Sequence, residues 1–172
     1  MPTASLEFAL PDSSATEALG AALARAFCVP SRGAVVHLRG ELGSGKTTCA
    51  RSLLHALGVT ATVRSPTYTL VDTYSSPELK FVHVDLYRLR SSAEVEELGL
   101  RDLTGPKSLM LIEWPEQGGA AVPAADLDVQ LRYVDVGESR AASLRAGSES
   151  GASWLAKLGL DHSLMPYVSN LT

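Results

Sequence analysis

The sequence is poor in cysteine and in the residue groups that bind zinc. Cys28 and Cys49 are the only cysteines among 172 residues, and both lie in apolar patterns typical of helices. A disulfide is therefore not expected, and the cytoplasm is the default compartment. No group of His, Cys, Asp or Glu has the spacing of a zinc site, and we expect the four scattered histidines to be structural or surface residues.

Long apolar runs and a surplus of basic charge are also absent. No run approaches the roughly 18 apolar residues of a membrane helix, and no basic region followed by an apolar core marks a secretory signal near the N-terminus. We therefore expect no membrane association. The net charge is −4, whereas a protein that grips nucleic acid alone usually carries a basic stripe. If nucleic acid is involved, another protein should hold most of it.

What the sequence does contain is a phosphate-binding loop. Residues 40–47 read GELGSGKT and match the pattern GxxxxGK[ST] at every position. An apolar run at 34–38 predicts a buried strand before the loop, and apolar residues at helical spacing predict a helix that ends at Gly58. Glycines let the backbone curl around a phosphate, and the helix N-terminus then points at the anion. Lys46 is expected to reach the β- and γ-phosphates, and the Thr47 hydroxyl to bind Mg²⁺.

The rest of the chain predicts an α/β protein built around this unit. Capping boxes at Ser14 with Glu17 and at Ser91 with Glu94 predict two further helix starts. We expect residues 1–147 to form the P-loop domain and residues 148–172 to be a partly flexible tail with a short helix. Alternating or apolar runs predict strands at residues 6–10, 63–74 after an initial turn, 81–84 antiparallel to the strand before it, 109–112, 127–133 and 139–146.

Two of these strands end in an acid, namely Asp85 and Glu113. Phosphoryl transfer needs carboxylates near Mg²⁺ and a group that places the attacking water, and ligands of open α/β sheets bind at the carboxyl ends of strands. Either acid could be the Walker B-type acid, and the alternative is a cap of the next turn. Thr67, in a Ser-Pro-Thr turn, could be a switch that senses γ-phosphate or a plain turn residue. Trp114 could be a core residue or pack at the site.

The choice of base is argued from motifs that are missing. GTPases of the common type read guanine with an Asn-Lys-x-Asp segment. Asn170 is the only asparagine, and no lysine lies two residues before an aspartate. The Leu-Ser-Gly-Gly-Gln signature of transporter ATPases is absent as well. We therefore expect ATP rather than GTP.

With these motifs located, the chain resembles the TsaE family (formerly YjeE), bacterial ATPases of tRNA threonylcarbamoyladenosine synthesis. The resemblance covers about residues 5 to 135, in the family's order and with its approximate spacing. Two departures are mild, because Glu41 stands where an aspartate is common and Ser44 where an alanine is common. The segments that carry the resemblance are residues 40–48, 65–70, 83–88, 97–100 and 112–116.

This resemblance implies a three-layer α/β P-loop NTPase-like fold, with a mixed sheet and helices on both faces. It implies slow, Mg²⁺-dependent ATP hydrolysis that supports two partners, TsaB and TsaD, on tRNAs that read codons beginning with A. The TsaD partner transfers threonylcarbamoyl to the adenosine next to the anticodon. The tRNA would then be bound through the complex rather than by this chain alone.

By position, the resemblance also assigns roles to single residues. Thr47 and Glu113 would hold Mg²⁺. Lys46, Asp85 and Thr67 would serve catalysis. Asp85 would position the water or contact a ligand of the metal, and Thr67 would lie in a switch segment of residues 65–69. The residues that would contact the nucleotide are Glu41, Leu42, Gly43, Ser44, Gly45, Lys46, Thr47, Thr48, Trp114 and Thr16.

Two other functions share the same loop. A small-molecule kinase has a loop and size of this kind, and residues 88–101 could imitate its arginine-rich lid, although the glutamates interleaved there argue against one. A nucleotide-dependent binding module would hydrolyse ATP negligibly. ATP turnover measured alone, with small acceptors and with partner proteins separates the three functions.

Overall fold

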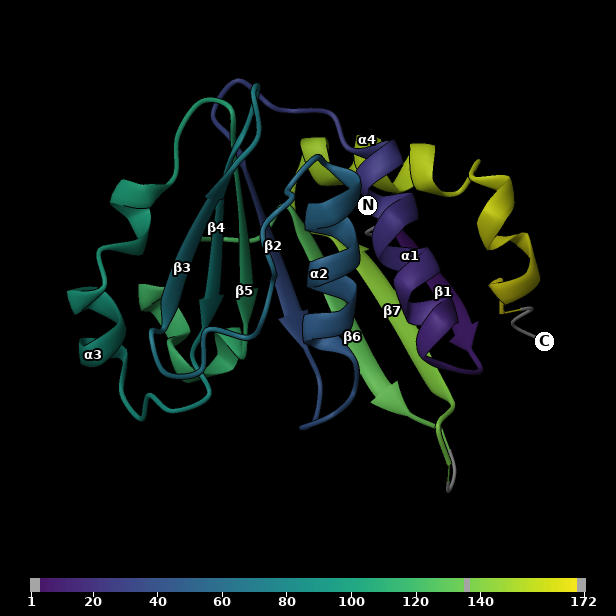
Figure 1. Ribbon diagram of the computed structural model, residues 1–172, viewed down its shortest axis with the longest axis horizontal. Coiled ribbons are helices and arrows are strands. Elements are labelled where there is room, and N and C mark those ends of the chain that lie inside the picture. Colours follow the sequence, from purple (N-terminus) through teal and green to yellow (C-terminus); the bar gives the residue numbers. More distant parts are fainter. Residues whose placement is uncertain (1–3, 135–136, 170–172) are drawn as a thin grey trace.

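A seven-stranded mixed sheet forms the centre of the computed structural model, which describes residues 4–134 and 137–169 (Figure 1). The strand order is β1-β7-β6-β2-β5-β4-β3. The strands are β1 (Ser5–Leu10), β2 (Ala34–Arg39), β3 (Val71–Ser75), β4 (Lys80–Asp85), β5 (Ser108–Glu113), β6 (Leu127–Tyr133) and β7 (Arg140–Ala146). The helices are α1 (Ser13–Ala26), α2 (Lys46–Ala56), α3 (Ser92–Glu97) and α4 (Glu149–Leu158), with 3₁₀ turns η1 (Leu100–Leu103), η2 (Pro115–Gln117), η3 (Gly119–Ala121) and η4 (His162–Tyr167).

The middle of the sheet is parallel and its flanks are antiparallel. Strand β2 pairs parallel with β5 and β6, and β4 pairs parallel with β5. The pairs β1–β7, β6–β7 and β3–β4 are antiparallel. All six residues of β5 are buried, as expected of a continuously apolar strand covered on both faces, whereas β6 alternates between buried and partly exposed positions. The predicted mixed sheet and the predicted antiparallel hairpin are both confirmed.

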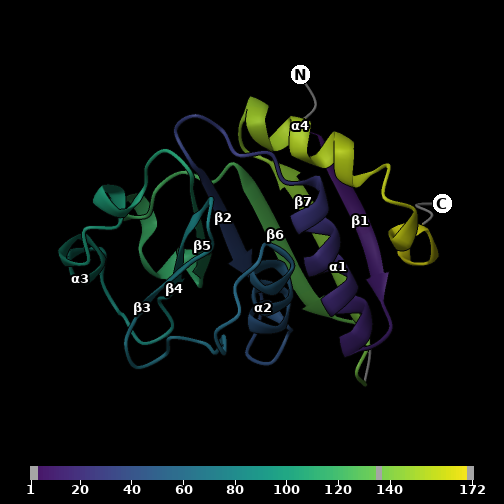
Figure 2. The ribbon, with the colours of Figure 1, turned by 45° about the horizontal axis from the view of Figure 1, so that its top comes forward.

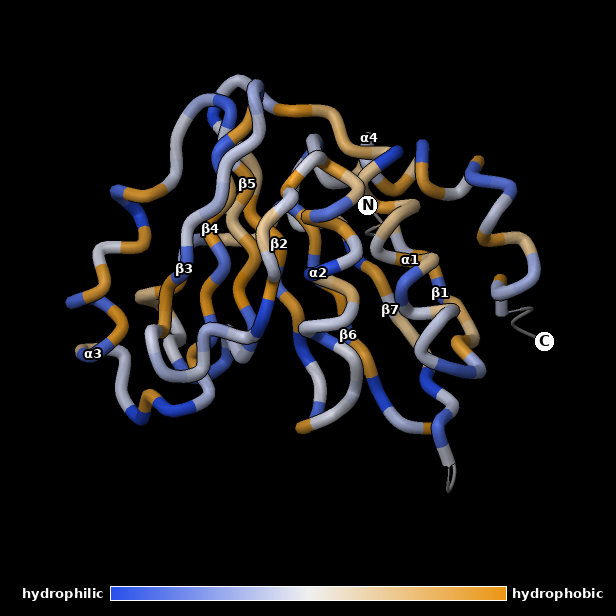
Figure 3. Tube along the Cα trace, viewed as in Figure 1, coloured by the Kyte–Doolittle hydropathy of each residue, from blue (hydrophilic) through white to orange (hydrophobic). Residues whose placement is uncertain are grey.

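Two hydrophobic clusters, one on each face of the sheet, make the fold three-layered. Helices α1, α2 and α4 cover one face, where Leu109 and Leu111 of β5 point. Helix α3 and the turns η1 and η3 cover the other face over β4 and β5, where Met110 and Ile112 point. Successive residues of a strand face opposite sides, so the same strand supplies both clusters. Figure 3 shows the hydrophobic residues along these inner strands and the hydrophilic ones mostly in the loops.

The predicted N-cap of the first helix, Ser14, is wrong by two residues. The N-cap of α1 is Asp12, whose carboxylate accepts hydrogen bonds from the Ala15 backbone N–H at 2.9 Å and from the Ser14 hydroxyl at 2.6 Å. Asp12, two residues after the end of β1, takes the N-cap position ahead of Ser14, because its carboxylate already accepts the Ala15 N–H. The second capping box is present as predicted, between Ser91 and Glu94 at the start of α3.

The segment after residue 148 packs onto the hydrophobic cluster that α1 and α2 form with the sheet. Figure 2 shows α4 beside α1. Trp154 of α4 donates its indole N–H to the Leu23 carbonyl at 2.9 Å, and its ring lies 4.7 Å from that of Phe27. Arg25 of α1 and Asp161 form an ion pair at 2.9 Å. Within residues 4–134 and 137–169, no helix has the length and apolar content needed to cross a membrane.

Candidate nucleotide-binding site

The loop between β2 and α2 has the backbone shape of a phosphate cradle. Gly43 and Gly45 have positive φ angles of 77° and 103°, which side chains other than glycine rarely adopt. At Gly40 a Cβ atom would lie 2.2 Å from the Leu131 carbonyl oxygen, so only glycine fits against β6 there. No side chain caps the start of α2. Its first N–H groups are therefore available to an anion.

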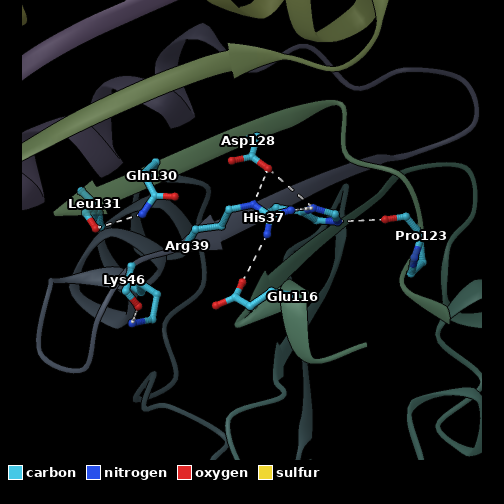
Figure 4. Close-up of polar contacts among 9 residues, drawn as sticks. His37, Arg39, Lys46, Glu116, Pro123, Asp128, Gln130 and Leu131 are labelled. Carbon is cyan, nitrogen blue, oxygen red and sulfur yellow. Dashed lines mark hydrogen bonds and ion pairs between the residues drawn. The ribbon is translucent and has the colours of Figure 1, made fainter. Parts of the chain in front are cut away.

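Polar contacts on the other side of β2 hold the start of this loop in place. Arg39, the last residue of the strand, donates to Asp128 at 2.7 Å and to Glu116 at 3.2 Å (Figure 4). His37, two residues earlier, contacts the Pro123 carbonyl through Nε2 at 2.9 Å. Burial lowers the pKa of His37 from its ordinary value. These contacts tie β2 to β6 and to η2, and so fix where the loop begins.

Lys46 folds back over the loop that precedes it. Its Nζ donates to the carbonyls of Gly40 at 2.7 Å and Glu41 at 2.8 Å, and it lies 4.1 Å from the centre of the Trp114 ring. The residue is only 4% exposed, and this burial lowers the pKa of its ammonium, while the nearby carboxylates, first among them Glu113, oppose the shift. A buried ammonium bonded to loop carbonyls can exchange these partners for phosphate oxygens.

Thr47 and Glu113 meet directly at the start of α2. The Thr47 hydroxyl lies 2.9 and 3.0 Å from the two carboxylate oxygens of Glu113, to which it donates. The lone pairs of this oxygen are not used as acceptors here, so it can bind a cation while its O–H still points to the carboxylate. Glu113 is 2% exposed and also accepts from His83 Nε2 at 2.8 Å. We expected this histidine to be structural or on the surface, and in the structure its imidazole is buried and hydrogen-bonded to the Glu113 carboxylate.

Asp85 lies at the centre of a second polar group. Its carboxylate accepts from the Ser65 hydroxyl, and Thr67 Oγ1 lies 2.9 Å from Ser65 Oγ and 3.5 Å from Asp85. The Tyr87 backbone N–H donates to the other carboxylate oxygen at 2.9 Å. Asp85 therefore caps the turn after β4 and holds the predicted switch segment at the same time. The cap of the next turn, one of the two alternatives given by the sequence, is present; the role as a Walker B-type acid stays a prediction.

A cavity of about 290 Å³ brings most of the predicted site residues together. Glu41 and Ser44 do not line it, although the Glu41 carbonyl holds Lys46, and the Ser44 hydroxyl is buried with no hydrogen-bond partner within the described residues. Thr16 lies behind the loop, where it lines an adjoining pocket with Gly43, Gly45 and Thr48. The residues of the 290 Å³ cavity are Leu42, Gly43, Gly45, Lys46, Thr47, Thr48, Ser65, Thr67, Asp85, Tyr87, Glu113 and Trp114.

Tyr87 and His83 are the residues that sequence reasoning missed. The Tyr87 ring lies 5.0 Å from that of Trp114 and widens the aromatic wall of the cavity. A signal for His83 existed, because it is two residues before Asp85 on one strand and so must share its face. Trp114 itself has φ +59°, a left-handed conformation uncommon for a bulky side chain, and this turns the chain sharply after β5.

The oxygen donors in the cavity suit a hard divalent cation bound together with phosphate. Within the part of the chain that the structure describes, no three residues of the His, Cys, Asp and Glu types form a metal-binding group. Thr47 and Glu113 are adjacent oxygen donors, and Mg²⁺ typically takes one or two protein ligands and completes its shell with water and substrate phosphates. The glycine cradle and this donor pair thus fit a Mg²⁺-nucleotide.

The fold and the loop together define a P-loop protein of the three-layer α/β class. The chain belongs to the TsaE family, since a family model described as threonylcarbamoyl adenosine biosynthesis protein TsaE matches residues 10–142. It is 45% identical over 101 residues to the Haemophilus influenzae tRNA threonylcarbamoyladenosine biosynthesis protein TsaE, covering 59% of this chain and 64% of that protein. The chain thus spans somewhat less than two thirds of that relative.

A second relative agrees with this family, and a solved structure shares the fold. The protein of the same name from Synechocystis is 38% identical over 117 residues, covering 66% of this chain and 72% of that protein. The crystal structure of Bacillus subtilis YdiB superposes with a TM-score of 0.75 at 24% identity, over 92% of this chain and 97% of that one. At this identity the superposition shows the shared fold.

Proposed function

We propose that this chain binds and slowly hydrolyses Mg²⁺-ATP in support of the threonylcarbamoyl modification of tRNA. The observation that carries the proposal is the contact between Thr47 and Glu113 at 2.9 Å, at the end of a phosphate loop whose Lys46 is buried beside them. A second polar group around Asp85 lies in the same cavity. Membership of the TsaE family supports the choice of pathway.

Six residues of the cavity have a part in this proposal. Bound Mg²⁺-ATP supplies the γ-phosphoryl group and the metal charge that offsets its oxygens. Lys46 leaves the loop carbonyls to neutralise phosphate, while Thr47 and Glu113 hold the metal, either directly or through one water. Asp85 is placed to orient a water and accept its proton. Thr67, held through Ser65, couples the position of the switch segment to that carboxylate.

The nucleoside half of ATP extends past Thr48 in this proposal. The pocket on that side is lined by side chains from α1 and from the β6–β7 hairpin, with Thr16, Glu138 and Arg140 among them. The sequence contains no Asn-Lys-x-Asp segment that could read guanine, so we expect ATP to be preferred to GTP.

Partners of the TsaB and TsaD kind would carry out the modification itself. In the proposal, the transfer reaches the adenosine next to the anticodon of tRNAs that read codons beginning with A, and this chain supports its turnover. The net charge of −4 argues that the tRNA is held mainly by those partners. We therefore expect the isolated chain to bind tRNA weakly at physiological salt.

The test compares Lys46→Ala with Lys80→Ala, which removes an exposed lysine at the start of β4. Lys46→Ala should lower ATP turnover by about 10²–10³-fold, the scale of losing one preorganised charge-stabilising donor, while circular dichroism stays unchanged. Lys80→Ala should behave as wild type. Turnover of Lys46→Ala close to wild type would contradict the phosphate-loop assignment.

Turnover under three conditions separates the competing functions, and a fourth measurement tests the choice of base. Turnover is followed with the chain alone, with small acceptors and with partner proteins, and GTP competes against ATP for binding. Phosphate transferred to a small acceptor would indicate a kinase. ATP binding without turnover, even with the partners present, would indicate a binding module.

A further inference from the structure

We propose that His83 is a positioning residue of this site, which holds the Glu113 carboxylate in the orientation that Thr47 and a bound metal require. The inference rests on the proposed function, because it concerns the residue thought to hold Mg²⁺. It goes beyond that function in assigning a role to a buried side chain that does not line the cavity.

Strand register explains how the two residues meet. In the parallel pair β4–β5, Asp85 lies opposite Glu113 and His83 lies opposite Leu111. The side chains of His83, Asp85 and Glu113 all point to the face covered by α2, because they share the alternation of Phe81 and Leu109. The Glu113 side chain reaches diagonally to His83 Nε2, 2.8 Å from Oε1, rather than straight across to Asp85.

The contact is fully enclosed and leaves Glu113 few other partners. His83 is 0% exposed and Glu113 is 2% exposed. A carboxylate only accepts hydrogen bonds, so the imidazole Nε2 must carry the proton that it donates. A buried carboxylate without partners would be costly, and within the described residues its side-chain partners are Thr47 and His83 alone.

The second ring nitrogen of His83 argues against a purely space-filling role for this side chain. His83 Nδ1 is buried with no hydrogen-bond partner within the described residues. A side chain needed only to fill space there would be more stable as an apolar residue, which has no polar atom to bury. The hydrogen bond to Glu113 is thus the one polar contact that the described structure gives this ring.

Fixing one carboxylate oxygen decides where the other one points. With Oε1 held by His83, rotation of the carboxylate about its own axis is restricted, and both oxygens stay within 3.0 Å of the Thr47 hydroxyl. Groups that orient metal-binding side chains in this way typically contribute 10–100-fold to metal affinity. Loss of the hydrogen bond should therefore weaken the metal-dependent part of nucleotide binding and leave the metal-free part unchanged.

The experiment compares two substitutions of different hydrogen-bonding ability in the full chain. His83→Leu fills the site without a donor, whereas the amide of His83→Gln can place an N–H near the position of Nε2. His55→Leu is the control, since it makes the same replacement at an exposed histidine of α2 that contacts the Ala61 carbonyl and does not touch Glu113. ATP affinity is measured by calorimetry with Mg²⁺ and with a chelator, and the ratio of the two affinities is the readout.

We expect His83→Leu to lower this ratio about 10–100-fold, and both His83→Gln and His55→Leu to keep it within about 2-fold. A direct readout uses Mn²⁺ in place of Mg²⁺, with its binding to the ATP-loaded protein followed by electron paramagnetic resonance. Melting temperatures identify any variant that fails to fold; if His83→Leu does not fold, His83→Ala with the same two readouts takes its place.

Three results would overturn the inference. A donor-free variant that folds and keeps the wild-type ratio shows that the hydrogen bond is not needed. Equal losses in the Leu and Gln variants show that ring packing, and not the donor, matters. If the wild-type protein binds ATP equally well with Mg²⁺ and with a chelator, the metal site is overturned and the proposed function with it. The first two results leave that function standing.

Discussion

Two regions of the molecule bury their residues in opposite ways. One is the set of carboxyl ends of β2, β4 and β5, and the other is the contact between α1 and α4. At the strand ends, Lys46, Asp85 and Glu113 are each less than 5% exposed, and they are held by hydrogen bonds. Between α1 and α4, burial is apolar, and the Trp154 indole N–H is satisfied by a backbone carbonyl. A buried charged pair is often no more stabilising than well-packed apolar residues of the same volume, whereas buried aromatic area contributes much.

This difference teaches that activity and stability are separable in the molecule. Substitutions at the strand ends should change ligand chemistry with a small effect on folding. Substitutions between α1 and α4 should change folding with little effect on the ligand affinity of the molecules that remain folded. The following predictions test that separation, from the largest expected effect to the smallest.

The two carboxylates at the strand ends should respond differently to substitution. Asp85→Ala should slow single-turnover hydrolysis about 10²–10⁴-fold, the scale of losing an acid–base group, and leave ATP binding nearly intact. Glu113→Ala should weaken Mg²⁺-dependent ATP binding, because it removes the partner of Thr47. Calorimetric titration with and without Mg²⁺, together with rapid-quench hydrolysis, measures both. If Asp85→Ala loses the Mg²⁺-linked binding and Glu113→Ala keeps it, the roles are reversed.

The two tryptophans offer the same comparison for stability. Trp154→Ala should lower the free energy of unfolding by about 3–5 kcal/mol, because it empties a buried aromatic site and removes the hydrogen bond to Leu23. Trp114→Ala, which changes a half-buried ring over Lys46, should cost far less stability and alter ATP affinity instead. Urea unfolding and ATP titration of both variants decide between the outcomes. A larger stability loss for Trp114→Ala would contradict the separation.

The ion pair between Arg25 and Asp161 should contribute a small, pH-dependent stabilisation. The hydrogen bond from Arg25 lowers the pKa of Asp161 from 3.8 to about 2. Because the folded pKa is the lower one, the contribution is present above pH 3.8 and is lost as pH falls towards about 2. Asp161→Asn should therefore cost less than about 1 kcal/mol at neutral pH, and the difference from wild type should vanish near pH 2. A difference that stays constant over this range, measured by urea unfolding, would show that the charge is not involved.

The two cysteines should differ in reactivity without any change in fold. Cys49 lies in α2 next to the site, and burial, with a further contribution from Glu113, raises the pKa of its thiol to about 12. Since the thiolate is the reactive form, Cys49 should resist iodoacetamide until the protein unfolds. The exposed Cys28 should react in the native state. Mass spectrometry of labelled wild type and of Cys28→Ser provides the measurement, and rapid native labelling of Cys49 would indicate that α2 opens locally.

Most of the architecture could be predicted from the sequence because its signals are local. The glycine spacing, the apolar run before Gly40 and the helical spacing after Lys46 each depend on neighbours within a few residues, and the structure has β2 and α2 at these positions. The alternation in β6 and the continuous burial of β5 also confirm the predicted strands. The family resemblance, which used several such segments in order, is confirmed by the match over residues 10–142.

Other features were decided by tertiary structure, because they depend on which strands become neighbours. Nothing local to His83 indicates that β4 will lie beside β5 in a register that brings it to Glu113. The placement of Thr16 behind the loop, and of Trp154 against Leu23, depends on how α1 packs on α2 and α4. The sequence by itself determined the chemistry available and the order of its elements, since these follow from residue type and spacing. Strand register and helix packing, which sum many weak and distant contacts, decided which side chains share the cavity.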